Sequence, residues 1–506
     1  MTMASKVPSS KETSLLRAAY DLFLGNTSDW YKFTIVGFLV LNPVILAVAG
    51  PFVAGWLILL EFIFTLALAL KCYPLQPGGL LAIEAILMDL ATPSAVYHET
   101  EVNFPVILLL MFMVAGIYFL RDLLIYIFSK LFLRVRSKSA LSILFCLSSA
   151  AMSAFLDALT VMAVIITVAT GLYGVYHRVA STLDNEEDHK GPLHAARKHD
   201  FDRFRAFLRS IVMHSAVGTA LGGVATLVGE PQNLLIGKVL GWDFGAFFMH
   251  VAPVSLPVLG VGLLTCFGVE RLRTFGYGAE LPETVRETIA QHDRDLALKH
   301  DRRTTVRLFA QGIAALLLMA GLAFHVAEVG LIGLSVIVLA TAFCGVIEEK
   351  RLGHAFEEAL PFTALLVTFF AVVAVIHEQN LFRPVIDFVL AHDGKQQLAL
   401  MYLANGILSA ISDNVFVANV YISSVKTAFD AGAIDQGQFE LLAVAINTGT
   451  NIPSVATPNG QAAFLFLLTS ALAPLIRLGY GQMLWMAIPY TVTMTITGLV
   501  AVYAFL

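Results

Sequence analysis

Charged residues are scarce in this chain. Asp, Glu, Lys and Arg make up 14% of its 506 residues, whereas a soluble domain usually carries about a quarter. Hydrophobic residues make up 58%, and the mean hydropathy is +0.77. This balance excludes an ordinary soluble domain and predicts a polytopic membrane protein, with room for roughly ten or more spans of about 20 residues. The net charge of −5 is small and spread along the chain, so the composition indicates no nucleic-acid partner.

Cysteine is also rare, and its few copies lie far apart, in or at the ends of apolar runs: Cys72, Cys146, Cys266 and Cys344. Without a CxxC pair, the sequence predicts neither a metal site nor a disulfide framework. The enzyme motifs HExxH and GxSxG are absent, and Gly237-Lys238 stands without the Gly-rich loop of an ATPase. We therefore predict a protein that is not an enzyme and needs no cofactor. No long apolar core precedes Trp30, so we expect an amphipathic N-terminal segment rather than a cleaved signal peptide.

Two pairs of similar stretches divide the chain into related halves. The first pair is SAFLD, ending at Asp157, and SAISD, ending at Asp413, an offset of 256 residues (413 − 157). The second pair is GTALGGVATLVG, 218–229, and GTNIPSVATPNG, 449–460, an offset of 231 residues (449 − 218). The same order in both halves argues against a chance match. Each half thus has an Asp within an apolar run and then a Gly/Thr/Asn-rich break, a pattern that points to a transporter's binding site.

The placement of Lys and Arg predicts the topology, because positive residues mark cytoplasmic loops. Basic segments at 121–138 and 178–205 flank the apolar run 139–175. This run then enters and leaves the membrane from the cytoplasmic side, as a re-entrant hairpin with Asp157 near its tip. Two full spans joined by a short external turn would also place both basic segments on the cytoplasmic side. The second hairpin, 396–430, has few positive flanks and should open to the outside. We expect an all-α fold of about eleven transmembrane helices plus two hairpins, in two inverted-topology repeats, with the N-terminus cytoplasmic and the C-terminus periplasmic.

Asp157 and Asp413 are the candidate ion-binding and proton-carrying residues. An ionised carboxylate at bilayer depth costs several kcal/mol, so its presence indicates function. Na⁺ prefers oxygen ligands, which hydroxyls, amides and freed backbone carbonyls provide at helix breaks. The expected supporting residues are Ser153, Thr160, Thr226, Glu230, Asn233, Ser409, Ser412, Asn414, Asn451, Thr457 and Asn459. For any one of them, helix capping or interhelical hydrogen bonding is an equal alternative.

Three further polar residues are weaker candidates, and two of them, Glu61 and Glu84, lie in apolar runs with no counterpart at the matching offsets. For Glu61 and Glu84, which belong to the first half, a structural pairing role is favoured. For His214, a proton-sensing role and a hydrogen-bonded structural role both remain open, the second being more common.

Several motifs resemble those of a known family. FLDALT at 155–160, VGEPQN at 228–233, SDNVFV at 412–417 and NTGTNIPSVATPNGQAAFLF at 447–466 resemble the NhaB family of bacterial sodium/proton antiporters, part of a wider ion-transporter superfamily. The resemblance implies a multi-pass protein of the bacterial inner membrane that exports Na⁺, and Li⁺ as a further substrate, in exchange for H⁺, contributing to Na⁺ and pH homeostasis. It also implies elevator-type alternating access and a homodimer. The alternative is an anion or arsenite carrier, but two acidic hairpin tips disfavour an anionic substrate.

The same resemblance implies a division into scaffold and transport parts. The expected segments are 1–30 as the amphipathic segment, 31–138 and 308–392 as the two halves of the scaffold, 139–268 and 393–506 as the two halves of the transport part, each with a hairpin and a broken helix, and 269–307 as a cytoplasmic loop.

Overall fold

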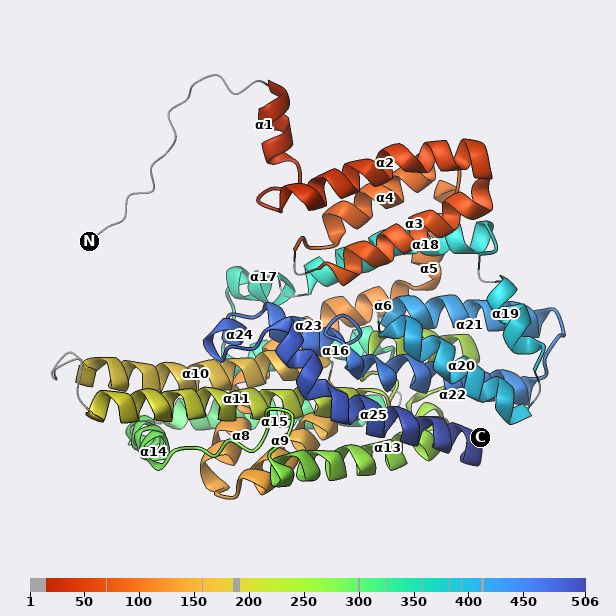
Figure 1. The fold of residues 1–506 in the computed structure, drawn as a ribbon. Helices are drawn as coiled ribbons and strands as arrows, with labels where there is room; N and C mark the ends of the chain where they lie inside the picture. The colour runs from red at the N-terminus through yellow and green to blue at the C-terminus, as the bar shows by residue number, and fades with distance from the viewer. Residues whose placement is uncertain are drawn as a thin grey trace. The chain divides into compact units, whose positions relative to one another are not determined.

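The computed structural model describes residues 15–69, 71–156, 158–184, 192–298, 301–324, 326–357, 359–381, 383–392, 394–410 and 414–506. All regular structure in these ranges is helical (Figure 1), so the prediction of an all-α fold is confirmed. The chain divides into two compact units, the first formed by the residues up to Val96 with Val367–Leu381, and the second by Tyr97–Leu366 with Phe382–Leu506.

The first unit is built on a group of apolar helices. Its elements are α1 (Leu15–Leu22), α2 (Asp29–Ala49), α3 (Pro51–Ala67), α4 (Leu75–Leu87) and the part of α18 (Leu360–Glu378) that starts at Val367. Gly50, with a φ of 84°, turns the chain between α2 and α3, a conformation that glycine adopts without steric cost. Helix α1 exposes Leu15 and Leu22. The Lys32 Nζ donates to the carbonyl of Tyr20 over 3.1 Å and so ties α1 to α2.

The second unit holds both members of each repeated pair. Its helices are α5 (Pro93–Val102, from Tyr97), α6 (Phe104–Leu108), α7 (Val114–Tyr118) after a π-helical stretch (Leu109–Met113), α8 (Arg121–Arg134), α9 (Lys138–Ser153), α10 (Ala158–Asp184), α11 (Pro192–Gly223), α12 (Pro231–Leu240), α13 (Phe244–Leu272), α14 (Glu283–Leu298), α15 (Arg302–Ala323), α16 (Val329–Cys344), α17 (Glu349–Glu357), α19 (Arg383–Leu390), α20 (Gly394–Ser409), α21 (Asn414–Asp430), α22 (Gln436–Asn451), α23 (Ala462–Thr469), α24 (Leu472–Leu475) and α25 (Tyr480–Phe505).

Several of these helices have the length and composition of membrane spans. In the described ranges, α2, the Ala158–Tyr176 part of α10, α13, α15 and α25 could each cross a bilayer, and α5 with α6–α7 could form one further span bent by 60°. The shorter apolar helices are α3, α4, α9, α16 and the Thr363–Glu378 part of α18. These helices fit a polytopic membrane protein, whereas about eleven crossings and inverted repeats stay predictions.

The two halves pack their repeated stretches in the same way. In the first half α9 packs on α11, and in the second α20 packs on α22. A Cβ at Gly218 of α11 would lie 2.3 Å from the Cys146 carbonyl oxygen, and one at Gly449 of α22 would lie 2.6 Å from the Tyr402 carbonyl oxygen. The glycines differ by 231 positions and the carbonyl residues by 256 (402 − 146), which are the offsets of the sequence repeat. Equivalent residues therefore make equivalent helix contacts.

Two basic segments that the sequence places on the cytoplasmic side contain helices, and their placement on that side stays a prediction. Helix α10 extends to Asp184 and α11 begins at Pro192, so helix covers most of 178–205. Helix α14 lies within 269–307. The reason is that Lys, Arg and Glu have high helix propensity, and a charged segment can continue a helix beyond the apolar run.

Candidate ion-binding site

The candidate carboxylates belong to two short connections between helices. Asp157, Ser412 and Asp413 lie outside the described residues. In the first half, α9 ends at Ser153 and α10 begins at Ala158; in the second, α20 ends at Ser409 and α21 begins at Asn414. The sequence therefore places each Asp directly before the first residue of a new helix. Such interruptions free backbone polar groups that a continuous helix would use.

A threonine from each broken helix holds the chain just before each Asp. The Thr226 hydroxyl donates to the Ala154 carbonyl over 2.5 Å, and the Thr457 hydroxyl donates to the Ala410 carbonyl over 2.5 Å. The threonines differ by 231 positions and the alanines by 256. Each acceptor lies three residues before a candidate Asp (157 − 154; 413 − 410). The repeat thus includes a specific hydrogen bond between a break and the segment that leads to the carboxylate.

The breaks themselves are short and polar. In the first half, α11 ends at Gly223 and α12 starts at Pro231. The Asn233 Nδ2 donates to the carbonyls of Gly223 over 2.7 Å and Thr226 over 2.6 Å. The first contact satisfies a carbonyl that the end of α11 would leave unpaired, and the second ties Asn233 to the break. Gly222 has a different role from the one its sequence position indicates, because a Cβ there would lie 1.9 Å from the Ala150 carbonyl oxygen. It is a packing glycine of the α9–α11 contact, and the break begins after Gly223.

The second break has its own network. The Gln461 Nε2 donates to the Asn451 carbonyl and to the Ser454 hydroxyl, each over 2.8 Å. The Ser409 hydroxyl donates to the Thr450 carbonyl over 2.7 Å and also contacts the Asn414 Oδ1. Ser409 and Asn414 flank the connection that contains Asp413. The break and the ends of α20 and α21 are therefore joined.

The two breaks meet inside the second unit. The Gln232 Nε2 donates to the Asn451 Oδ1 over 2.7 Å, and the Asn451 Nδ2 donates to the Asn233 Oδ1 over 3.3 Å. The Asn447 Nδ2 donates to the Val224 carbonyl over 3.1 Å. All four amide side chains are fully buried. One polar cluster thus connects segments more than 200 positions apart in the chain.

Several buried oxygens of this cluster have no hydrogen-bond partner among the described residues: Ser153 Oγ, Gln232 Oε1 and Gln461 Oε1. Glu230, 3% exposed, precedes the first residue of α12, and Gln461 takes the equivalent place before α23 (230 + 231 = 461). Buried polar atoms in proteins are normally satisfied. Oxygens without a donor, together with the carboxylate of Glu230 in the first break, form an arrangement that fits a hard cation such as Na⁺.

A profile of the family described as "Bacterial Na+/H+ antiporter B (NhaB)" matches residues 11–506. The chain belongs to the NhaB family. Proteins called Na(+)/H(+) antiporter NhaB from Pseudomonas entomophila (strain L48) and Marinomonas sp. (strain MWYL1) are 61% identical over 485 residues and 58% identical over 499 residues. These alignments cover 95% of this chain and 97% of the first relative, and 98% of this chain and 100% of the second.

Membership of the NhaB family confirms the resemblance found in the sequence, and confirms a transporter rather than an enzyme. Most of the expected supporting residues lie in the cluster that joins the breaks and the hairpin ends: Thr226, Asn233, Ser409, Asn414, Asn451 and Thr457. Thr160 lies in the first turn of α10, and Asn459 lies in the turn before α23. Thr450 and Ser454 were not expected. The repeat could not indicate Ser454 as a site residue, because the equivalent position in the first half is Gly223 (223 + 231 = 454).

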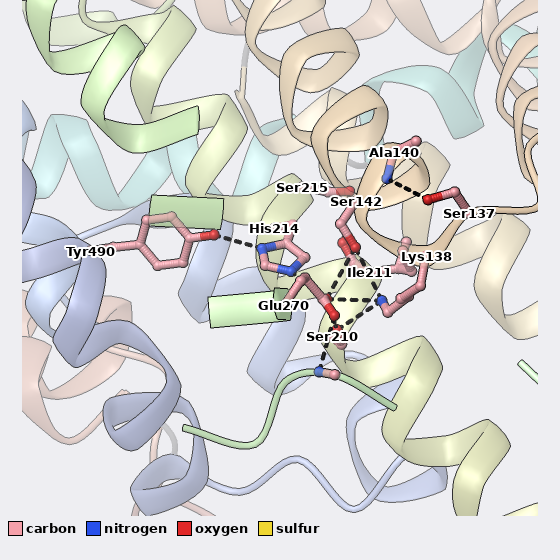
Figure 2. Close-up of polar contacts among 11 residues, drawn as sticks. Ser137, Lys138, Ala140, Ser142, Ser210, Ile211, His214, Ser215, Glu270 and Tyr490 are labelled. Carbon is pink, nitrogen blue, oxygen red and sulfur yellow. Dashed lines mark hydrogen bonds and ion pairs between the residues drawn. The ribbon is translucent and has the colours of Figure 1, made fainter. Parts of the chain in front are cut away.

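This NhaB protein has a second polar cluster, centred on Glu270 near the end of α13 (Figure 2). The Glu270 Oε1 accepts from the Ser210 hydroxyl over 2.6 Å and forms an ion pair with the Lys138 Nζ over 3.0 Å. It also lies 2.7 Å from the His214 Nε2, and the His214 Nδ1 lies 2.6 Å from the Tyr490 hydroxyl. His214 is therefore fully buried, with both ring nitrogens paired. The cluster ties together α9, α11, α13 and α25, as expected if His214 has a hydrogen-bonded structural role.

Proposed function

We propose that this NhaB-family protein exports Na⁺ in exchange for H⁺, with Asp157 and Asp413 as carriers that bind either ion. A desolvated carboxylate favours its protonated form, whereas a nearby cation favours the ionised form. One carboxylate therefore holds H⁺ or Na⁺ but not both. If only a loaded site crosses the barrier, competition for it produces exchange.

The observation that carries this proposal is the matched pair of threonine bonds. Thr226 and Thr457 fix the backbone three residues before Asp157 and Asp413 over the same distance in both halves. Their breaks meet through buried amides, and nearby oxygens lack donors. Oxygen acceptors beside a carboxylate suit a hard monovalent cation. The description of the family to which the chain belongs also names Na⁺/H⁺ antiport.

We further propose how the site reaches both sides of the membrane. The hairpins and breaks would move as a transport part (139–268 and 393–506) against a scaffold (31–138 and 308–392), in elevator-type alternating access and as a homodimer. The two halves would have inverted topology in the bacterial inner membrane, with the N-terminus cytoplasmic and the C-terminus periplasmic. Li⁺, a smaller hard cation, would be a second substrate, and Na⁺ export would contribute to Na⁺ and pH homeostasis.

An anion or arsenite carrier is the second candidate on the same scaffold. Among the described contacts of the breaks, the groups are hydroxyls, amides and carbonyls, with Glu230 as an added acid. An anionic substrate would need positive charge or a surplus of donors to replace its hydration. The surplus oxygens of this cluster favour a cation.

Proteoliposomes that contain the purified protein test the proposed exchange. An outward or inward Na⁺ gradient should drive proton movement in the opposite direction in buffers without any transportable anion, and Li⁺ should replace Na⁺. Proton movement that requires arsenite or another added anion would support the second candidate. Empty liposomes provide the control for passive leakage.

Cysteine labelling tests the proposed orientation. In a background without the native cysteines, single cysteines at Lys190 and Arg294 should react only from the cytoplasmic side, and one at His392 only from outside, because Lys and Arg mark cytoplasmic loops. Labelling of Lys190 and His392 from the same side would contradict the inverted arrangement.

A further inference from the structure

A separate pair of acidic residues lies in the first unit. Asn42 of α2 stands between Glu61 of α3 and Glu84 of α4. The Asn42 Nδ2 donates to the Glu61 Oε2 and to the Glu84 Oε2, each over 2.8 Å. Because both oxygens contact the same nitrogen, they lie at most 5.6 Å apart (2 × 2.8 Å). Three neighbouring helices thus bring two carboxyl groups, more than 20 positions apart in the chain, to one amide.

The surroundings of this pair are apolar and lack a compensating charge. Asn42 is fully buried, Glu61 is 2% exposed and Glu84 is half-buried. Helix α2 is a candidate span, and α3 and α4 are apolar. The basic residue on α2, Lys32, lies about 15 Å away along the helix and donates to the carbonyls of Tyr20 and Asp21. Among the described residues, no Lys, Arg or His forms an ion pair with Glu61 or Glu84.

The other ionisable groups of the first unit do not supply that charge. Lys71 and Cys72 follow the end of α3, beyond Ala67. The Val367–Leu381 segment packs on α3 through Phe369, whose ring lies 5.8 Å from that of Phe62, and it carries His377 and Glu378 near its end. The Glu378 carboxylate accepts from Thr92. Two like charges at this separation in apolar surroundings are not both ionised, and one proton serves the pair.

Unpaired oxygens at the same place point independently to a bound proton. The Glu61 Oε1 and the Asn42 Oδ1 are buried and have no hydrogen-bond partner among the described residues. Both atoms are acceptors when the carboxyl group is ionised, so the cluster has more acceptors than donors. A proton on Glu61 adds the missing donor. Buried polar atoms are normally satisfied, and a proton on the carboxyl group supplies a donor where no basic residue forms an ion pair among the described residues.

We propose that Asn42, Glu61 and Glu84 form a second proton-binding site, which holds one proton for two carboxyl groups at neutral pH. The amide of Asn42 positions both carboxyl groups among apolar helices. This site is distinct from Asp157 and Asp413 and does not depend on where Na⁺ binds. It gives the protein a protonation step of its own, and release of its proton leaves two negative charges among apolar helices.

Infrared spectroscopy of the full chain in lipid tests this site. The background is the double variant Asp157→Asn, Asp413→Asn, in which the proposed carriers cannot contribute a protonated carboxyl signal. At neutral pH, the double variant Glu61→Gln, Glu84→Gln should lack the absorption of one protonated carboxyl group that the background shows. The signal should not change when Na⁺ is added. Glu349→Gln, at an exposed position of α17, is the matched control and should change nothing.

Three results would overturn the proposal. The protonated signal remaining in the double variant would place the proton elsewhere, and its absence from the background at neutral pH would mean that both groups are ionised. A signal that disappears on addition of Na⁺ would make this a Na⁺ site instead. If Glu61→Gln does not fold, Glu84→Gln at the half-buried position should shift or remove the absorption, and an unchanged absorption would contradict the shared proton. Because the carriers are absent from this background, failure here leaves the proposed Na⁺/H⁺ exchange untouched.

Discussion

Replacing the packing glycine Gly218 by Ala tests the contact that organises the first half. The new Cβ would lie 2.3 Å from the Cys146 carbonyl oxygen, whereas ordinary contacts begin at 3.4 Å, so α9 and α11 must separate by about 1 Å. A backbone carbonyl cannot turn aside as a flexible side chain can. Overpacking of this kind costs about 1–3 kcal/mol, which exceeds the gain of up to about 1 kcal/mol from replacing Gly in a helix. We expect Gly218→Ala to be less stable than the wild type.

The equivalent glycine and an open glycine complete the experiment. Gly449→Ala should also destabilise, because its Cβ would lie 2.6 Å from the Tyr402 carbonyl oxygen. Gly171 in α10 has no atom within 4 Å of an added Cβ, so Gly171→Ala should be neutral or stabilising by about 0.5–1 kcal/mol. The measurement is the thermal midpoint of the purified, detergent-solubilised protein, followed as the fraction that elutes as a single species after heating. If Gly218→Ala is as stable as Gly171→Ala, the close helix contact is wrong.

The remaining predictions concern the two polar clusters. Thr226→Val and Thr457→Val each leave a carbonyl without its donor, at a cost of about 1–3 kcal/mol. Both should weaken the apparent Na⁺ affinity of exchange in proteoliposomes, whereas the Ser variants should retain it. Unchanged affinity in both Val variants would show that the breaks are not part of the ion-binding site. Lys138→Ala removes the ion-pair partner of Glu270, whose side chain is fully buried, and should destabilise by about 3–5 kcal/mol, measured as the thermal midpoint at neutral pH. Adding Glu270→Gln should restore part of that loss, and a failure to do so would show that the charge is not its cause.

The local features of the site could be predicted from the sequence, because they depend on residue type and order. The two offsets, the position of each Asp between helices and the breaks before Pro231 and after Asn451 all follow from repeated motifs in one chain. The same motifs indicated Thr226 and Thr457 as site residues. They did not indicate that these side chains bind the backbone before the Asp residues, since a motif does not show which atoms its side chains will contact.

Long-range contacts could not be predicted in this way. Glu61 and Glu84 have no counterparts in the repeat, and only the folding of α2, α3 and α4 brings both to Asn42. Glu270 likewise gains its partners from α9 and α11. A single sequence shows that a carboxylate lies in an apolar run and therefore needs a partner. It does not show which of many polar residues, often more than 50 positions away as with Ser210, will be that partner.

The most direct test of the proposed exchange is Na⁺-driven proton movement in proteoliposomes containing Asp157→Asn or Asp413→Asn. Asn keeps the shape and hydrogen-bonding capacity of Asp but removes the charge and the titratable proton. Both variants should insert normally, because loss of a buried charge does not oppose insertion. Each should abolish or severely reduce proton movement, which a higher Na⁺ concentration should not restore, whereas Asp→Glu should retain partial exchange with altered Na⁺ affinity. Near-normal exchange in both Asn variants would contradict the proposed carriers.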